Sequence, residues 1–125
     1  MQVTSDISNI TVIFRPERFN LLRDALKGHG ILGMTVIHVE GCGLQGGKVE
    51  YYRGSELQID LLPKTKVEII APSDKVEPII ETIQKVLKTG EVGDGKIFVY
   101  DVQTVVRIRN GSRGLDALSA KDGEK

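Results

Sequence analysis

The stretch Ile59-Asp-Leu-Leu-Pro-Lys-Thr-Lys-Val-Glu-Ile-Ile-Ala71 decides the fold, because its polar and apolar residues alternate from Thr65 onward as in a half-buried strand. An amphipathic helix is predicted next, with Asp74 and Glu77 as a capping box and Gly90 as the stop. Its apolar face consists of Val76, Ile79, Ile80, Ile83, Val86 and Leu87. A second strand, Lys96–Tyr100, follows, so this half of the chain predicts a strand, a helix and a strand.

The N-terminal half predicts the same unit. A β-branched strand at Ile10–Phe14 ends at Arg15-Pro16, a helix covers about Pro16 to His29, and a strand covers Met34–Glu40. Two such units predict an α+β fold of the ferredoxin-like type, a βαββαβ sandwich with both helices on one face of an antiparallel sheet. We also expect a short additional strand at Val105–Arg109.

The chain length and composition predict one folded domain. The chain has 125 residues, of which 40% are hydrophobic and 27% charged, as in ordinary globular proteins. We place the single domain at 1–125, with a folded core at about 9–109, an exposed loop at 43–58 and a flexible C-terminal tail at 110–125. The loop is glycine-rich and charged, and its length suggests a function.

The charge balance and the number of cysteines indicate which partners and which cellular compartment are compatible with this sequence. Lys plus Arg and Asp plus Glu both number 17, so no global positive field favours direct binding of nucleic acid. No apolar run is long enough to span a membrane, and the residues at the N-terminus do not predict a secretory signal. Cys42 is the single cysteine, which excludes an internal disulfide. These features predict a cytoplasmic protein.

Two glycine motifs are candidates for an anion site. Gly41-Cys-Gly-Leu-Gln-Gly46 matches G-x-G-x-x-G, but no predicted helix follows it, so a Rossmann site is disfavoured. A Walker A loop is also disfavoured, because Lys48 precedes Val49 rather than Ser or Thr. Gly93-Asp-Gly-Lys96 is the second motif, and alone it is more typical of an ordinary Asp-Gly hairpin turn than of an anion site.

Two arginines make a phosphate site more plausible. Arg107 and Arg109 share one face of the expected strand, and like charges on one face are compatible with a bound anion. A solvated edge strand explains the two arginines equally well. Lys64 and Lys66 also share a face of their predicted strand, but their spacing does not indicate whether they bind a ligand.

No catalytic set of residues emerges. His29, at a helix end, and His38, on a strand, are interpreted as structural, and Cys42 as a small buried residue without a base partner. The sequence therefore does not predict an enzyme.

Taken together, several sequence motifs resemble those of the PII nitrogen-regulatory signal-transduction family. They are most similar to the motifs of its Gram-positive members. The resemblance extends from about Ile10 to Leu118. It rests on Gly41-x-Gly43-x-Gln45, Tyr52-Arg-Gly-Ser-Glu56, Leu62-Pro-Lys-x-Lys-x-Glu-Ile69, Thr89-Gly-x-x-Gly-Asp-Gly-Lys-Ile-Phe-Val99 and Arg107-Ile-Arg109.

This resemblance implies a homotrimeric sensor with ATP or ADP in three clefts between subunits. It also implies that 2-oxoglutarate binds beside ATP through Mg²⁺, and that the exposed loop at 43–58, called the T-loop, reports the bound state. The implied targets are ammonium channels or other transporters, nitrogen-metabolism enzymes and transcription regulators. A transporter target would place the protein peripherally at the inner face of the membrane.

The resemblance also assigns residues. The nucleotide-binding set would be Ile13, Thr35, Gly41, Gly43, Leu44, Gln45, Ile70, Gly93, Asp94, Gly95, Lys96, Arg107 and Arg109. The 2-oxoglutarate set would be Gln45, Gly47, Lys64 and Gly93, with Gln45 also offering its amide oxygen to Mg²⁺. Tyr51, Tyr52 and Arg53 would contact a partner, and Ser55 matches a serine that is phosphorylated in cyanobacterial relatives.

Three positions depart from the family pattern. Leu44 and Gly46 stand where many members carry an Arg–Lys pair beside the glutamine, so the preference for ATP over ADP is open. Leu57 stands at the position of the modified tyrosine and has no hydroxyl to nucleotidylate. The alternative is a PII-like paralogue that uses the same cleft for a cyclic or other adenine nucleotide and regulates a membrane transporter.

Overall fold

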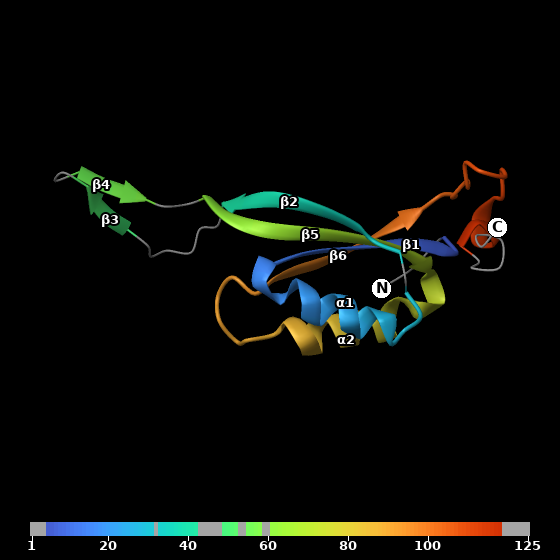
Figure 1. Cartoon of the computed structure of the whole chain (residues 1–125), viewed down its shortest axis with the longest axis horizontal. Helices are drawn as coiled ribbons and strands as arrows, with labels where there is room; N and C mark the ends of the chain where they lie inside the picture. The colour runs from blue at the N-terminus through green and yellow to red at the C-terminus, as the bar shows by residue number, and fades with distance from the viewer. Residues whose placement is uncertain (1–4, 32, 43–48, 53–54, 59–60, 119–125) are drawn as a thin grey trace.

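The computed structural model describes residues 5–31, 33–42, 49–52, 55–58 and 61–118 as one antiparallel sheet with two helices on one face (Figure 1). The strands of this sheet are β1 (Ile7–Phe14), β2 (Thr35–Cys42), β5 (Leu61–Pro72) and β6 (Gly95–Val102). The helices are α1 (Phe19–Lys27) and α2 (Val76–Leu87), each preceded by a 3₁₀ turn, η1 (Pro16–Arg18) and η2 (Ser73–Lys75).

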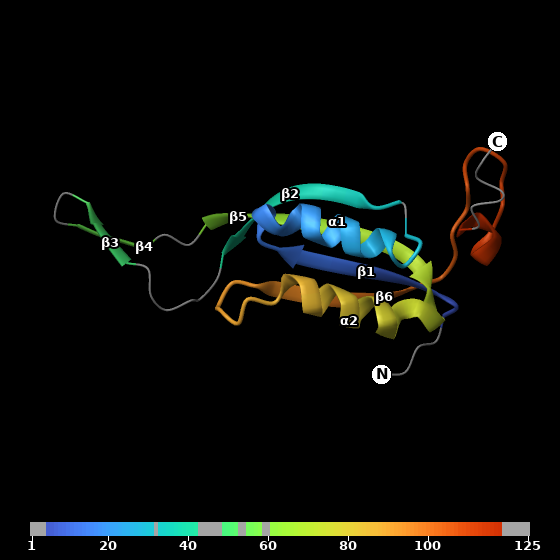
Figure 2. The same ribbon diagram turned by 60° about the horizontal axis from the view of Figure 1, so that its bottom comes forward.

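The strand order confirms the ferredoxin-like α+β prediction. The order across the sheet is β2-β5-β1-β6, and every neighbouring pair is antiparallel. Each helix therefore connects two parallel strands that have a third strand between them. Turned by 60°, Figure 2 shows α1 and α2 side by side over the same face of the sheet.

The core lies between this face and the helices. Its buried side chains come alternately from the strands and at helical spacing from α1 and α2, as the two periodicities require. The cluster consists of Ile10, Val12, Phe14, Leu22, Leu26, Val67, Ile69, Ala71, Val76, Ile79, Ile83 and Leu87. His29, in the turn after α1, is linked to α2 by a hydrogen bond between its Nε2 and the Thr82 hydroxyl, consistent with a structural role.

The opposite face of the sheet carries no helix. Thr35, Ile37, Ile13, Ile70, Lys66, Lys96, Phe98 and Tyr100 share this face by strand alternation and register. Ile70, Phe98 and Tyr100 are exposed there, at 39%, 38% and 52%. We call this surface the helix-free face.

Several local predictions were wrong. The start of α2 has no side-chain cap, so Asp74 and Glu77 do not form a capping box. The predicted T-loop contains β3 (Val49–Tyr52) and β4 (Ser55–Gln58), which pair as a separate two-stranded sheet beyond the ends of β2 and β5 (Figures 1 and 2). Cys42 is exposed rather than buried.

The expected strand at Val105–Arg109 is not formed. Only Val106 makes an isolated bridge, to Arg113, and the chain then turns into the 3₁₀ helix η3 (Gly114–Leu118). The described part of the predicted tail is therefore a folded hook. Across the parts of the chain that the structure covers, no helix has the length and apolarity needed to span a membrane.

Candidate functional site

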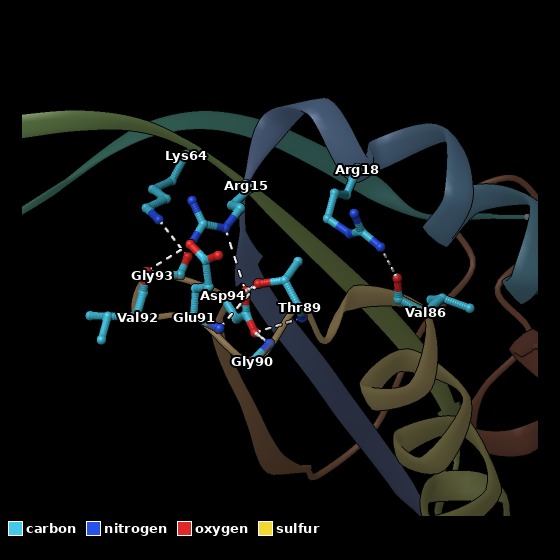
Figure 3. A network of polar contacts seen from close by, with 10 residues as sticks. All are labelled: Arg15, Arg18, Lys64, Val86, Thr89, Gly90, Glu91, Val92, Gly93 and Asp94. Atoms are coloured by element: carbon cyan, nitrogen blue, oxygen red, sulfur yellow. Dashed lines mark hydrogen bonds and ion pairs between the residues drawn. The ribbon is translucent and has the colours of Figure 1, made fainter.

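The loop between α2 and β6 is organised around the carboxylate of Asp94 (Figure 3). The amides of Thr89 and Gly90 donate to its Oδ2 at 2.8 and 3.0 Å, and the Thr89 hydroxyl donates to its Oδ1. These hydrogen bonds, the one from the Thr89 side chain first, hold the pKa of Asp94 well below its usual value. The carboxylate is therefore ionised and shapes the loop at Thr89–Gly95, which we call the glycine loop.

Gly95 ends this loop where it meets β1. Its φ is +115°, and a Cβ at this position would lie 1.9 Å from the carbonyl oxygen of Ile13. Neither the backbone conformation nor the space admits a side chain. Glycine is thus required at position 95 by the close approach of the loop to the strand.

Arg15 holds the other side of the glycine loop, a role that the sequence analysis missed. Its guanidinium donates to the carbonyl of Val92 at 2.7 Å and lies 3.5 Å from Oδ1 of Asp94 (Figure 3). Arg18 makes a parallel contact to the Val86 carbonyl in α2 at 2.9 Å. In the sequence, Arg15-Pro16 indicates only the end of a strand, whereas in the structure the guanidinium of Arg15 anchors a loop 77 residues later in the chain.

Lys64 reaches the same loop from β5. Its Nζ donates to the Gly93 carbonyl at 2.8 Å, and the side chain is half-buried. The structure therefore brings Lys64 and Gly93, both predicted for 2-oxoglutarate, into contact. Lys66 instead lies 3.7 Å from Glu68 on the same strand.

The predicted nucleotide residues of the sheet share the helix-free face. In the register, Ile13 lies between Lys66 on β5 and Lys96 on β6, and Thr35 lies opposite Glu68. Two lysines therefore flank Ile13 on this face, although Lys66 also lies 3.7 Å from Glu68 of the same strand. Ile70 lies farther along β5 on the same face.

Arg107 and Arg109 do not join this group in one chain. They follow the other end of β6, so the full length of that strand separates them from the glycine loop (Figure 1). Arg107 is held in the hook: its amide donates to the Ser112 carbonyl at 2.8 Å and its Nη2 to the Ala117 carbonyl at 2.7 Å. Because no strand forms here, the shared strand face predicted for the two arginines was wrong.

Other predicted residues cannot be compared in the same way. Gly43, Leu44, Gln45, Gly46, Gly47 and Arg53 lie outside the described residues, and for Tyr51, Tyr52, Ser55 and Leu57 only the backbone course is described. Among the residues that are described, no three His, Cys, Asp or Glu side chains gather as metal ligands. A hollow of about 610 Å³ beside Asp6, Asp101 and Leu115 contains none of the predicted nucleotide residues.

Comparison with known proteins identifies the family. Residues 7–112 match the family model described as "Nitrogen regulatory protein P-II". The chain belongs to the P-II family. Members of this family are regulatory signal transducers rather than enzymes.

Relatives from distant organisms match along the same length. Nitrogen regulatory protein P-II of Pyropia yezoensis is 50% identical over 112 residues, which cover 90% of this chain and 100% of the relative. Nitrogen regulatory protein P-II 1 of Escherichia coli strain K12 is 48% identical with the same coverage.

Solved structures agree with the fold. Bacillus subtilis GlnK matches with a TM-score of 0.76 and 37% identity, covering 90% of this chain and 99% of that one. Arabidopsis thaliana PII bound to citrate matches with a TM-score of 0.75 and 38% identity, covering 90% and 92%. These matches support the sheet and helix arrangement of this P-II protein.

Proposed function

We propose that this P-II protein is a homotrimeric regulator that binds ATP or ADP between subunits and senses 2-oxoglutarate with Mg²⁺ beside the nucleotide. The output is the conformation of the T-loop, which docks on a nitrogen-metabolism target. The observation that carries the proposal is the separation of the two predicted anion-binding groups within one chain.

That separation exceeds the length of a nucleotide's phosphate chain. The glycine loop precedes β6 and the two arginines follow it, and eight residues of strand span roughly 25 Å. A second copy of the chain can bring its Arg107 and Arg109 to the glycine loop of the first. A cleft between copies therefore closes a site that one chain leaves open.

The helix-free face supports the same assembly. Exposed Ile70, Phe98 and Tyr100 form an apolar group on a sheet face with no covering layer. An antiparallel sheet can leave one face in water, but large apolar side chains exposed on that face favour contact with another protein surface. Packing the faces of several copies together would bury these side chains and place Ile13, Lys66 and Lys96 beside the cleft.

The carboxylate effector is assigned to Lys64. Lys64 is half-buried and its ammonium contacts the glycine loop, so a ligand carboxylate there would touch both β5 and the loop. The related Arabidopsis thaliana PII is bound to citrate, itself a polycarboxylate. We place the protein in the cytoplasm, with an ammonium channel or other transporter, a nitrogen enzyme or a transcription regulator as the target; a transporter would bring it to the inner face of the membrane.

A second candidate function differs from the first in the small molecule that the protein senses. Leu44 and Gly46 replace two cations that many family members place near the terminal phosphates. A site without them favours ligands with fewer phosphates, such as ADP or a cyclic adenine nucleotide. The protein would then read another small signal and regulate a transporter.

Titration calorimetry with ATP and with ADP, repeated with Mg²⁺ and 2-oxoglutarate, separates these candidates. Binding of 2-oxoglutarate only in the presence of Mg-ATP supports the first, whereas tight binding of a cyclic nucleotide without any 2-oxoglutarate response supports the second. Arg109→Ala should weaken ATP binding at least about tenfold, because a phosphate contact is lost. Arg113→Ala, an exposed arginine of the same hook, is the matched control. Failure of every nucleotide to bind would refute both.

A further inference from the structure

Gly41 lies under the side chain of Lys64. A Cβ at Gly41 would be 3.1 Å from Cγ of Lys64 and 3.7 Å from its Cε. Gly41 belongs to β2, whereas Lys64 belongs to β5 and pairs with Val39. The lysine stem therefore crosses diagonally over the end of β2 before its Nζ reaches the Gly93 carbonyl at 2.8 Å.

The backbone of Gly41 gives no other reason for a glycine. It lies within a paired strand and is not among the glycines with positive φ. Glycine within a paired strand often marks a close approach of another group. Here the approaching group is the Lys64 stem.

A side chain at position 41 would change the path of Lys64. The contact of 3.1 Å is to Cγ, close to the lysine backbone, so the stem must rotate about its first torsion angles to make room. Rotation there moves the ammonium by much more than it moves Cγ. The hydrogen bond to the Gly93 carbonyl, 2.8 Å long in the parent, would then be weakened.

We propose that Gly41 is a positioning residue, whose lack of a side chain lets Lys64 deliver its ammonium to the glycine loop. This inference rests on the proposed function, in which that ammonium meets the effector carboxylate. Three elements then meet at one lysine: β5 supplies it, the end of β2 gives it room, and the glycine loop receives it. A change at the end of β2 would thereby alter the carboxylate site without removing any of its donors.

The test compares four full-length variants. Gly41→Val adds a branched side chain under Lys64, and Gly33→Val is the matched control, because a Cβ at Gly33 meets nothing within 4 Å. Lys64→Met keeps the stem without the ammonium, and the double variant Gly41→Val with Lys64→Met completes a double-mutant cycle. Each is measured by calorimetry with 2-oxoglutarate in Mg-ATP, and by amide hydrogen exchange of the Thr89–Gly95 segment without ligand.

We expect Gly41→Val to weaken 2-oxoglutarate binding about tenfold and to speed exchange in the glycine loop, with Gly33→Val unchanged in both. In the Lys64→Met background, Gly41→Val should add less than about a twofold effect on either measurement. Equal effects of Gly41→Val in both backgrounds would overturn the proposal, because position 41 would then act without Lys64.

The exchange measurement also separates this inference from the proposed function. If the parent protein binds no 2-oxoglutarate, the effector assignment fails, yet exchange in the glycine loop still shows whether Gly41 positions Lys64. If Gly41→Val does not fold, Gly41→Ala retains the 3.1 Å contact and replaces it in the same cycle.

Discussion

The amide of Thr89 donates to Oδ2 of Asp94 at 2.8 Å, and its hydroxyl donates to Oδ1 of the same carboxylate. The same hydroxyl accepts a hydrogen bond from the amide of Glu91 at 3.2 Å. Both ends of the glycine loop are thereby joined to each other next to the end of α2. A loop closed on itself in this way presents a defined surface rather than a range of conformations.

Asp94→Asn should loosen the glycine loop. The amide keeps one acceptor oxygen but replaces the other with a donor, so the contacts of Thr89 and Arg15 to Oδ1 and Oδ2 cannot all remain. We expect faster amide exchange at Thr89–Gly95 and nucleotide affinity lowered about three- to tenfold. Asp74→Asn, at an exposed aspartate of η2, is the control and should change neither.

The same carboxylate predicts an acid dependence of stability. Because folding lowers the pKa of Asp94, its contribution is present above the ordinary carboxyl value of 3.8 and is lost as the pH falls through the folded value. Acid unfolding of the parent and of Asp94→Asn should therefore converge at low pH. A stability difference that grows as the pH falls would contradict this linkage.

Gly95→Ala should be far more damaging than Gly90→Ala. Both glycines have positive φ, +115° and +91°, so either alanine introduces backbone strain of about 1–2 kcal/mol. At Gly95 the new methyl also collides with the Ile13 carbonyl, whereas at Gly90 nothing lies within 4 Å. Urea unfolding should show a loss above about 3 kcal/mol for Gly95→Ala alone. Equal losses would mean that the close approach to β1 is not maintained in solution.

The core-facing sides of the strands were predictable because their residues carry a strong period. Alternation from Thr65 onward placed Val67 and Ile69 on the core face, where the structure buries them completely. The helix faces followed in the same way from Leu22, Leu26 and the apolar residues of α2. Such patterns are local in sequence and directly reflect which side faces the core.

The site was predictable only in part, because its contacts link distant residues. Nothing in the local pattern of Arg15 indicates that it anchors Val92 and Asp94, and nothing around Gly41 indicates that Lys64 lies over it. The strand prediction for the segment after β6 was wrong for a related reason. The β-branched residues Val105 and Val106 favour a strand, but backbone hydrogen bonds from Gly111, Gly114 and Arg107 close a hook instead.

Leu22→Ala should test the core independently of the site. Leu22 is fully buried between α1 and the sheet, so removing three carbons leaves a cavity. The free energy of unfolding should fall by about 2–5 kcal/mol, measured by urea unfolding at one protein concentration. The adjacent Leu21 is half exposed, and Leu21→Ala should change stability by less than about 0.5 kcal/mol. Comparable losses at both positions would contradict the orientation of α1.

Phe98→Asp should break the assembly while leaving the subunit folded. Phe98 lies opposite Thr11 on the helix-free face and is absent from the buried core, so the core on the other face does not depend on it. In a trimer packed through this face, an unpaired carboxylate would be buried, which costs about 3 kcal/mol or more and lowers association at least about a hundredfold. Sedimentation equilibrium should show a monomer with a native circular dichroism spectrum, and nucleotide binding should be lost with the cleft. Leu21→Asp places the same charge on the helix layer and should leave both the trimer and nucleotide binding intact. A trimeric Phe98→Asp protein would mean that the copies associate through another surface.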